Sequence, residues 1–262
     1  MPTSDPLNVA FVWHMHQPDY RAAHTGAFEM PWVRLHAIKD YLDMVQILAD
    51  YPDIHATFNL VPCLVEQLED YVAPGFRDVY WEHALTPVEE LTPAARLFVV
   101  ERMCERPDHP RARSHPRYLE LAEKRLAHIH LGWEACSRVF TDEELRDLQM
   151  WFNLAWFDPE ALAREPLCGL VDRGRGFTEA DKQIISETQA DLLARTLPAY
   201  SDAARRGQVE LTTSPYYHPI LPLLANSDAA RISASDTLLP TRRFAHPEDA
   251  AEQIETALEK HE

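Results

Sequence analysis

The chain has 262 residues and carries 25 Lys and Arg against 42 Asp and Glu, a formal net charge of −17. A surface this acidic repels phosphate groups, so we expect neither nucleic acid nor an anionic membrane as a partner. The charge suits a neutral ligand, although simple solubility explains it equally well. The length fits one large α/β domain or two smaller ones.

The composition predicts a cytoplasmic protein with reduced cysteines. The sequence lacks the basic stretch and apolar stretch that mark a secretion signal, and no apolar run is long enough to span a bilayer. Its 4 cysteines are scattered, which is typical of reduced thiols rather than of a disulfide framework or a zinc site. With 7 glycines in the whole chain, there is no glycine-rich phosphate loop.

Three short segments are predicted to be buried strands: residues 8–14, 55–60 and 208–213. Each contains β-branched or other apolar residues and ends close to a proline. Helices are predicted over residues 37–49, from apolar residues at the helical period, and over 63–71, directly after the second strand. This order of strands and helices predicts an α/β fold with parallel strands.

A long helical block, about residues 84–206, separates the second strand from the third. Thr141 has capping-box spacing to a glutamate, and a similar signal starts a helix over residues 178–193. Gly207 is expected to end the block in the left-handed conformation. A last helix is predicted over residues 250–260.

The most informative motif follows the first strand and reads His14-Met-His16-Gln17-Pro18. Residues two apart on a strand point to the same side, so His14 and His16 face one shared space. Active sites of parallel α/β folds lie at the carboxyl ends of the strands. Metal-dependent barrel hydrolases use this spacing to hold a divalent ion, and a purely structural histidine pair is the alternative.

The third strand supplies a second group of candidates. Glu210 is expected to be buried, where a carboxylate is costly unless it is paired, so it is either functional or part of a buried network. Tyr216 and His218 follow at the mouth of the strand, where aromatic and polar groups suit a sugar ring. Trp32 is a further candidate for stacking. Asn59, at the end of the second strand, either caps the next helix or points into the cleft.

Four segments together resemble glycoside hydrolase family 57, in its α-amylase branch. WHMHQPDY resembles the first conserved region, and GQVELTTSPYYHPILPLL resembles the second. PWVRLHAIKDYLDM and TFNLVPCLVEQLEDY resemble the segments between these regions. The resemblance covers nearly the whole chain and is weakest in the helical block.

The resemblance implies a retaining enzyme of α-glucan metabolism, a glycosidase or glucanotransferase, on a distorted barrel of seven βα units. Residues 1–262 would be the amino-terminal part of this barrel, interrupted by the helical insertion at about 84–206. His14, His16 and Gln17 would bind the glucan or maltooligosaccharide, with Glu210 lining the cleft. Trp32, Tyr216 and His218, selected above for their aromatic and polar character, complete the expected substrate-binding set. No metal or cofactor is implied.

No catalytic residue is identified. A retaining glycosidase needs two carboxyl groups about 5 Å apart, a nucleophile and an acid/base. The resemblance places both on later conserved regions, beyond Glu262. The chain alone is therefore expected to be inactive and truncated, carrying the substrate side of a site.

Two other functions stay open at this stage. One is a metal-dependent barrel hydrolase that uses His14 and His16 as ligands. The other is a non-catalytic carbohydrate-binding or structural remnant. Whatever its function, the isolated chain would have an unpaired edge at the third strand, which predicts self-association through the open edge of the sheet.

Overall fold

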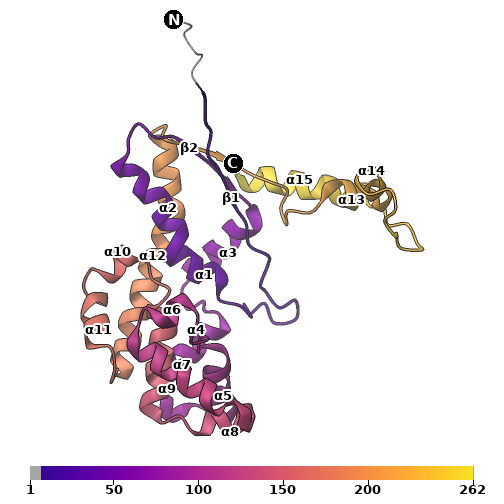
Figure 1. Cartoon of the computed structure of the whole chain (residues 1–262). Helices are drawn as coiled ribbons and strands as arrows, with labels where there is room; N and C mark the ends of the chain where they lie inside the picture. The colour runs from indigo at the N-terminus through magenta and orange to yellow at the C-terminus, as the bar shows by residue number, and fades with distance from the viewer. Residues whose placement is uncertain (1–6, 262) are drawn as a thin grey trace, which may run out of the picture. The chain divides into compact units, whose positions relative to one another are not determined.

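The computed structural model describes residues 7–261, and its contacts divide the chain into two compact units. One unit contains Met1–Asp19, Ile47–Glu69 and Pro198–Glu262, and we call it the sheet unit. The other contains Tyr20–Gln46 and Asp70–Leu197, and we call it the helical unit. Figure 1 shows the elements of both.

The sheet unit is built on a parallel sheet whose strand order is β1-β2-β3. The strands are β1 (Val12–Met15), β2 (Ala56–Leu60) and β3 (Val209–Thr212). All three predicted strands exist, and the parallel α/β class is confirmed. A closed barrel is not formed by these three strands, which in the described part of the chain make an open sheet.

One prediction about the strands is wrong, because β1 is not a buried strand. It begins at Val12 rather than at residue 8, and of its residues only Met15 is buried. The side chains of Val12 and Trp13 are 64% and 48% exposed. The physical reason is that β1 is an edge strand, so its apolar residues have a neighbouring strand on one side only.

The two faces of the sheet differ in polarity. On the apolar face, Phe58 is 1% exposed and lies edge-on to Tyr200 of α12, with ring centroids 5.1 Å apart. On the other face the register aligns His14 with Asn59, and Asn59 with Thr212. Because successive residues alternate between faces, these three polar side chains share one side of the sheet. The polar face is where the site described below is built.

Helices complete the sheet unit. As predicted, a helix follows β2 directly, and α3 spans Pro62–Val72. After β3 come the short helices α13 (Leu221–Ala225) and α14 (Ala230–Ser233), then α15 (Pro247–His261). The last helix was predicted over residues 250–260 and begins at the proline three residues earlier, which is a favourable first helical position.

The helical unit contains the remaining helices, most of them grouped in the lower part of Figure 1. The predicted helix over residues 37–49 is instead a run of shorter pieces: α1 (Trp32–His36), a π-helical segment (Ala37–Tyr41) and α2 (Leu42–Gln46). The others are α4 (Val79–Leu85), α5 (Pro93–Arg102), α6 (Pro110–Arg113), α7 (Pro116–His128), α8 (Trp133–Arg138), α9 (Asp142–Leu154), α10 (Pro159–Leu162) and α11 (Leu167–Arg173). The long helix α12 (Glu179–Arg205) contains Pro198 and passes from this unit into the sheet unit.

Capping contacts confirm the predicted helix starts at residues 141 and 178 and the end of the block at Gly207, whereas the helix predicted to end at residue 193 continues as α12 to Arg205. Thr141 and Glu144 form a reciprocal capping box at the start of α9. Thr178 exchanges hydrogen bonds with Asp181 at the start of α12. Gly207 ends that helix with a φ of 73°, the left-handed conformation that glycine adopts without a steric cost.

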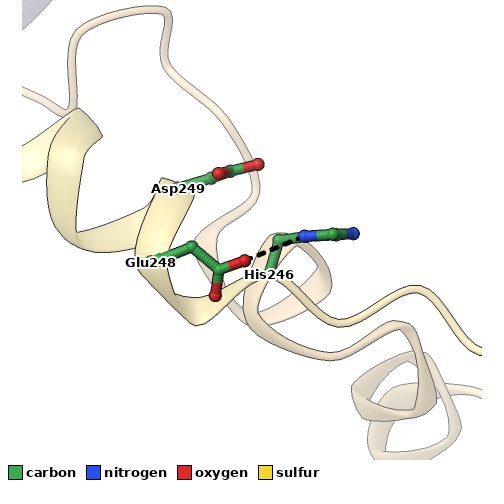
Figure 2. Close-up of side chains that lie close together, drawn as sticks. All are labelled: His246, Glu248 and Asp249. Carbon is green, nitrogen blue, oxygen red and sulfur yellow. Dashed lines mark hydrogen bonds and ion pairs between the residues drawn. The ribbon is translucent and has the colours of Figure 1, made fainter.

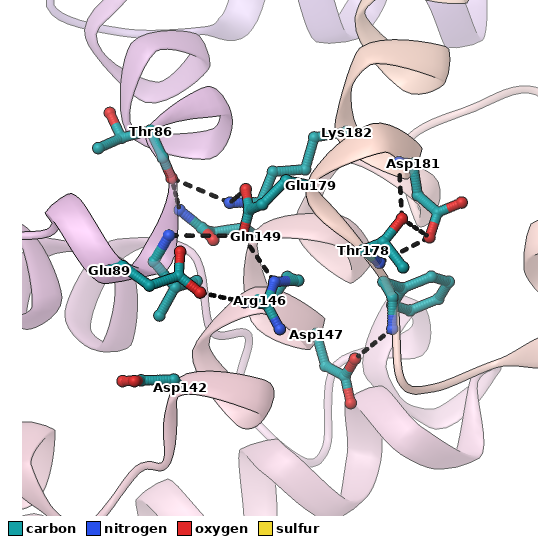
Figure 3. Close-up of polar contacts among 12 residues, drawn as sticks. Thr86, Glu89, Asp142, Arg146, Asp147, Gln149, Thr178, Glu179, Asp181 and Lys182 are labelled. Atoms are coloured by element: carbon teal, nitrogen blue, oxygen red, sulfur yellow. Dashed lines mark hydrogen bonds and ion pairs between the residues drawn. The ribbon is translucent and has the colours of Figure 1, made fainter.

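A polar network joins α4, α9 and α12 inside the helical unit (Figure 3). Arg146 Nε of α9 donates to Glu179 Oε1 of α12 at 2.6 Å. Lys182, only 2% exposed, donates to the carbonyl of Thr86 at 2.9 Å, and Gln149 donates to the same carbonyl at 3.1 Å. Burial lowers the pKa of Lys182, and the Glu179 carboxylate beside it opposes that shift. The network therefore satisfies charges that helix packing takes out of water.

Two further expectations can be compared with the fold. None of the four cysteines, which all lie in the described region, forms a disulfide; Cys63, Cys104 and Cys136 are buried and Cys168 is partly exposed. Burial raises the pKa of the Cys104 thiol to about 12, so this thiol is inert at neutral pH. Over residues 7–261, no helix combines the length and the apolar character needed to cross a bilayer.

Candidate functional site

Three imidazole rings meet at the carboxyl end of the sheet. The ring centroids of His14 and His218 are 4.5 Å apart, those of His16 and His218 are 5.0 Å apart, and those of His14 and His16 are 5.9 Å apart. The two histidines of the first motif thus lie on one side, as their spacing predicts. His218, far away in the sequence, joins them. We call these three residues the imidazole cluster.

His218 is brought to the cluster by a tight turn after β3. Its backbone N–H donates to the carbonyl of Pro215 at 2.7 Å, and its φ is 54°. A non-glycine residue rarely occupies this left-handed region, and such conformations concentrate at functional sites. The turn costs conformational energy, and its result is an imidazole placed against two others.

Tyr216 in the same turn holds the segment in place. Its carbonyl accepts from the N–H of Cys63 at 3.2 Å, and its own N–H donates to the carbonyl of Gln253 at 3.0 Å. Its hydroxyl donates to the carboxylate of Glu66. These contacts tie the turn to α3 and α15. Tyr216 was predicted to bind substrate. In the structure its hydroxyl group already donates a hydrogen bond to Glu66 of the same chain, and substrate binding stays a prediction.

The loop after β1 is fixed in the same way. The side chain of Gln67 donates to the carbonyl of Pro18 at 2.9 Å, and the thiol of Cys63 lies 3.5 Å from the carbonyl of Gln17. Gln17 itself is half-buried. The loop that carries His16 and Gln17 is therefore anchored on α3.

Asn59 lies at the centre of the polar face, and its side chain points into the site rather than capping a helix. Its Oδ1 lies 2.8 Å from Nδ1 of His14 and accepts from the hydroxyl of Ser214 at 2.9 Å. Its Nδ2 donates to Oγ1 of Thr212 at 3.3 Å. Thr212 and Ser214 were not among the predicted site residues. The signal that could have found them is the alternation of polar residues from Glu210 onward along β3.

The imidazole cluster favours the neutral state of His16. Burial lowers the pKa of His16, and the neighbouring imidazoles of His218 and His14 lower it further, because a second positive charge is unfavourable at this distance. Among the described residues, Nδ1 of His16 is a buried ring nitrogen that has no hydrogen-bond partner. A neutral His16 has one ring nitrogen that donates and one that accepts, which suits the hydroxyl groups of an uncharged ligand.

Glu210 does not occupy the environment predicted for it. It is exposed rather than buried, because the polar face of the sheet is open to solvent at this point. Its Oε2 accepts from the hydroxyl of Thr57 at 3.2 Å. Since Glu210 is aligned with Thr57, it lies one repeat of the pleat from Asn59 and Thr212, toward the amino ends of the strands. A pocket of about 300 Å³ there is lined by Glu210, Thr57 and their neighbours.

Trp32 belongs to the helical unit. It is half-buried at the start of α1, and its ring centroid lies 5.9 Å from that of Trp156. The Trp32 ring therefore contacts another aromatic ring within the helical unit.

Two groups of side chains in the described part of the chain bring three ligand atoms within 4.8 Å of one another. One consists of His246, Glu248 and Asp249 at the start of α15 (Figure 2), and the other consists of Asp43, Asp158 and Glu160. Neither contains a residue of the imidazole cluster. In the first group, the pKa of Glu248 is lowered by the backbone N–H that it accepts from and by His246, so this carboxylate has a role at the helix terminus without any ion.

Comparison with known proteins gives one result. No curated protein and no solved structure matches the chain significantly. The sequence model of the family described as Glycosyl hydrolase family 57 matches residues 10–261. This match includes all three strands and every residue of the imidazole cluster. The chain therefore belongs to glycosyl hydrolase family 57.

Proposed function

We propose that this protein acts in α-glucan metabolism and that its imidazole cluster binds the sugar. The observation that carries the proposal is the convergence of three imidazoles at the carboxyl ends of parallel strands, in a chain that belongs to a glycoside hydrolase family. Neutral imidazoles and amides recognise hydroxyl groups by hydrogen bonding. The formal net charge of −17 also favours a neutral polymer over an anionic one.

The proposed sugar-binding residues fall into two sets. His14, His16 and His218 contact the bound ring, and Gln17 contacts it from the anchored loop after β1. Glu210 is proposed to line the cleft, as the family resemblance suggests, and Tyr216 to add a contact as an aromatic and polar group after β3. Trp32 stays a candidate for stacking on a sugar ring. Of these, Glu210 is accessible from the polar face, where it is exposed and bonded to Thr57.

We also propose that the sheet unit supplies the first strands of the family's barrel. β2 and β3 are parallel neighbours although the helices from α4 to α12 lie between them in the sequence. This arrangement supports a barrel segment with an insertion of helices at about residues 84–206. The polar face of the sheet then corresponds to the inside of the barrel.

This chain is proposed to bind glucan without cleaving it. Retaining hydrolysis needs two carboxyl groups about 5 Å apart on opposite sides of the scissile bond. Within the three described strands Glu210 is the only acidic residue, and Thr57 already engages it. The polar face therefore offers sugar recognition rather than a pair of reacting carboxyl groups.

Calorimetric titration of the chain with maltoheptaose tests the proposal. We expect saturable binding that His14→Ala and His218→Ala each weaken about tenfold or more, the effect of about 1.4 kcal/mol. His130→Ala is the matched control, because this histidine is exposed in the helical unit. Binding that is equally strong in all three variants would refute the proposed site.

Two further measurements separate the competing functions. Release of reducing ends from maltoheptaose by the purified chain would show that it is an active hydrolase, contrary to the proposal. Stoichiometric zinc or manganese that is lost in His14→Ala would instead support a metal-dependent hydrolase. We expect neither result.

Self-association through the sheet is proposed as well. In the described region β1 and β3 each pair only with β2, so each has one open edge. Phe11, just before β1, and Val12 and Trp13 within it are exposed, which adds apolar surface next to this edge. Light scattering should show a concentration-dependent dimer. A monomer at all concentrations, or a dimer unaffected by Trp13→Lys, would exclude this interface.

A further inference from the structure

The hydrogen bonds around Asn59 restrict where the proton of His14 can lie. Oδ1 of Asn59 is a carbonyl oxygen and can only accept. It lies 2.8 Å from Nδ1 of His14, so a hydrogen bond between these atoms requires the hydrogen to be on Nδ1. In a neutral imidazole the other nitrogen, Nε2, then has a lone pair and no hydrogen.

The amide of Asn59 is itself held by the third strand. The hydroxyl of Ser214 donates to Oδ1 at 2.9 Å, and Oγ1 of Thr212 accepts from Nδ2 at 3.3 Å. Oδ1 thus receives two hydrogen bonds and Nδ2 makes one. Both hydroxyls can donate or accept, so these two contacts fix the position of the amide, and in the structure it is Oδ1 that faces His14. Two residues of β3 and its loop therefore hold the side chain of β2 that contacts β1.

We propose that Asn59 is a positioning residue that holds His14 as the Nδ1–H tautomer, so that Nε2 accepts a hydrogen bond from the ligand. The ligand, a hydroxyl of the glucan, rests on the proposed function. The tautomer does not, because every contact that defines it lies within the sheet unit of the free protein.

The surroundings of His14 make this choice of tautomer consequential. His218 and His16 lie within 6 Å of its ring, and neutral imidazoles each have one donor and one acceptor. A sugar hydroxyl that meets Nε2 of His14 therefore acts as the donor and keeps its oxygen as an acceptor for a neighbouring group. With the opposite tautomer, the same hydroxyl would have to accept from His14.

Long-range ¹H–¹⁵N NMR spectra of the imidazoles test the proposal directly, since they distinguish the two tautomers. In the wild-type chain without ligand, at a pH where His14 is neutral, we expect Nδ1 of His14 to be the protonated nitrogen. Asn59→Leu removes the carbonyl oxygen and the NH₂ group of the amide with little change in volume, and His14 should then be a mixture of the two tautomers. Asn59→Asp keeps an acceptor toward Nδ1 and should retain the Nδ1–H tautomer.

Maltoheptaose binding supplies the second readout. Asn59→Leu should bind about tenfold more weakly than wild type, and Asn59→Asp should recover most of that loss. Ser114→Ala, a change to an exposed serine of the helical unit, is the control for substitution itself. Thermal melts of each variant establish whether it is folded before its spectra are compared.

Each outcome bears on the proposal in one direction. His14 protonated on Nε2 in the wild type would overturn it, and so would Asn59→Leu spectra identical to those of the wild type. If Asn59→Leu does not fold, Asn59→Asp and the wild type still decide the tautomer. If the tautomers behave as expected but the wild type binds no glucan, the positioning role of Asn59 stands and the proposed function fails.

Discussion

The most decisive stability prediction concerns Arg34, whose side chain is completely buried in the helical unit. Its Nε donates to Asp78 Oδ2 at 2.8 Å, and one terminal nitrogen donates to Asn153 and to Gln189, each at 3.0 Å. The guanidinium carbon lies 5.0 Å from the ring centroid of Trp81. An arginine without access to water is tolerated only when its donors are matched in this way.

Arg34→Met keeps most of the apolar volume of the side chain and removes its charge. Asp78, which is also fully buried, would then retain its contacts with Tyr71 and with the N–H of Trp81 but would have no cation beside it. Breaking a buried ion pair by removing one partner costs about 3–5 kcal/mol. That is a large fraction of the roughly 5–15 kcal/mol by which a typical domain is stable.

Urea unfolding followed by circular dichroism measures this cost, and a double-mutant cycle identifies its source. Asp78→Asn preserves the oxygen that accepts from Trp81, so Arg34→Met combined with Asp78→Asn should be less destabilised than Arg34→Met alone. Arg195→Met is the control, because its pair with Asp191 is exposed and is expected to contribute under about 1 kcal/mol. A loss below about 1 kcal/mol for Arg34→Met, or strict additivity in the cycle, would refute the reasoning.

Three further predictions follow from features of single residues. Thr141→Ala removes the side-chain half of the capping box and should lower the unfolding free energy by about 1 kcal/mol in urea titrations, whereas an unchanged midpoint would mean that the box contributes nothing. Gly207→Ala places a residue with a β-carbon at a φ of 73° and should lower the unfolding free energy by about 1–2 kcal/mol, which a lower melting temperature would show. Folding lowers the pKa of His16 below the ordinary value of 6.5, so the unfolded chain binds a proton on this imidazole more readily than the folded chain does. The free energy of unfolding should therefore decline as the pH falls from 6.5 through the lowered pKa of the folded state. His16→Asn should flatten this part of the pH–stability curve, and a curve parallel to wild type would contradict the assignment.

Much of the fold was predictable because local signals and tertiary structure agree. The capping box at Thr141, the glycine after α12 and the proline that begins α15 each define a helix end by local features of the sequence. Such features are encoded in sequence spacing. The run from residue 32 to 46 is different, since a π-helical turn there interrupts the helical period and no local signal marks it.

Burial was harder to predict than secondary structure. The apolar residues of β1 suggested a strand covered on both faces, yet Val12 and Trp13 are exposed because β1 is at the edge. Glu210 was expected to be buried for the same reason and is exposed on the polar face. Alternation along a strand predicts that its two faces differ, but only the assembled sheet shows what covers each face.

The site was predictable in part. His14 and His16 are two residues apart, so their shared direction follows from strand geometry alone. The addition of His218 depends on a turn with positive φ, and the role of Asn59 depends on the register of three strands. These are long-range properties, and a single sequence contains no direct signal for them.

The register of the sheet has a consequence for the order of folding. His14 and Asn59 on β1 and β2 are 45 residues apart, whereas Thr57 and Glu210 on β2 and β3 are 153 residues apart. Closing the longer loop costs about 1 kcal/mol more by the logarithmic dependence of chain entropy on loop length, and distant contacts form slowly.

We therefore expect the first two strands to associate early and β3 to dock last. Pulse-labelling hydrogen exchange during refolding should protect the amides of β2 before those of β3. Thr212, Ser214 and His218 belong to β3 and the loop after it, so we expect the proposed sugar-binding site to form only in the last step of folding. A kinetic intermediate that lacks β3 would contain His14 and Asn59 without the partners that orient them.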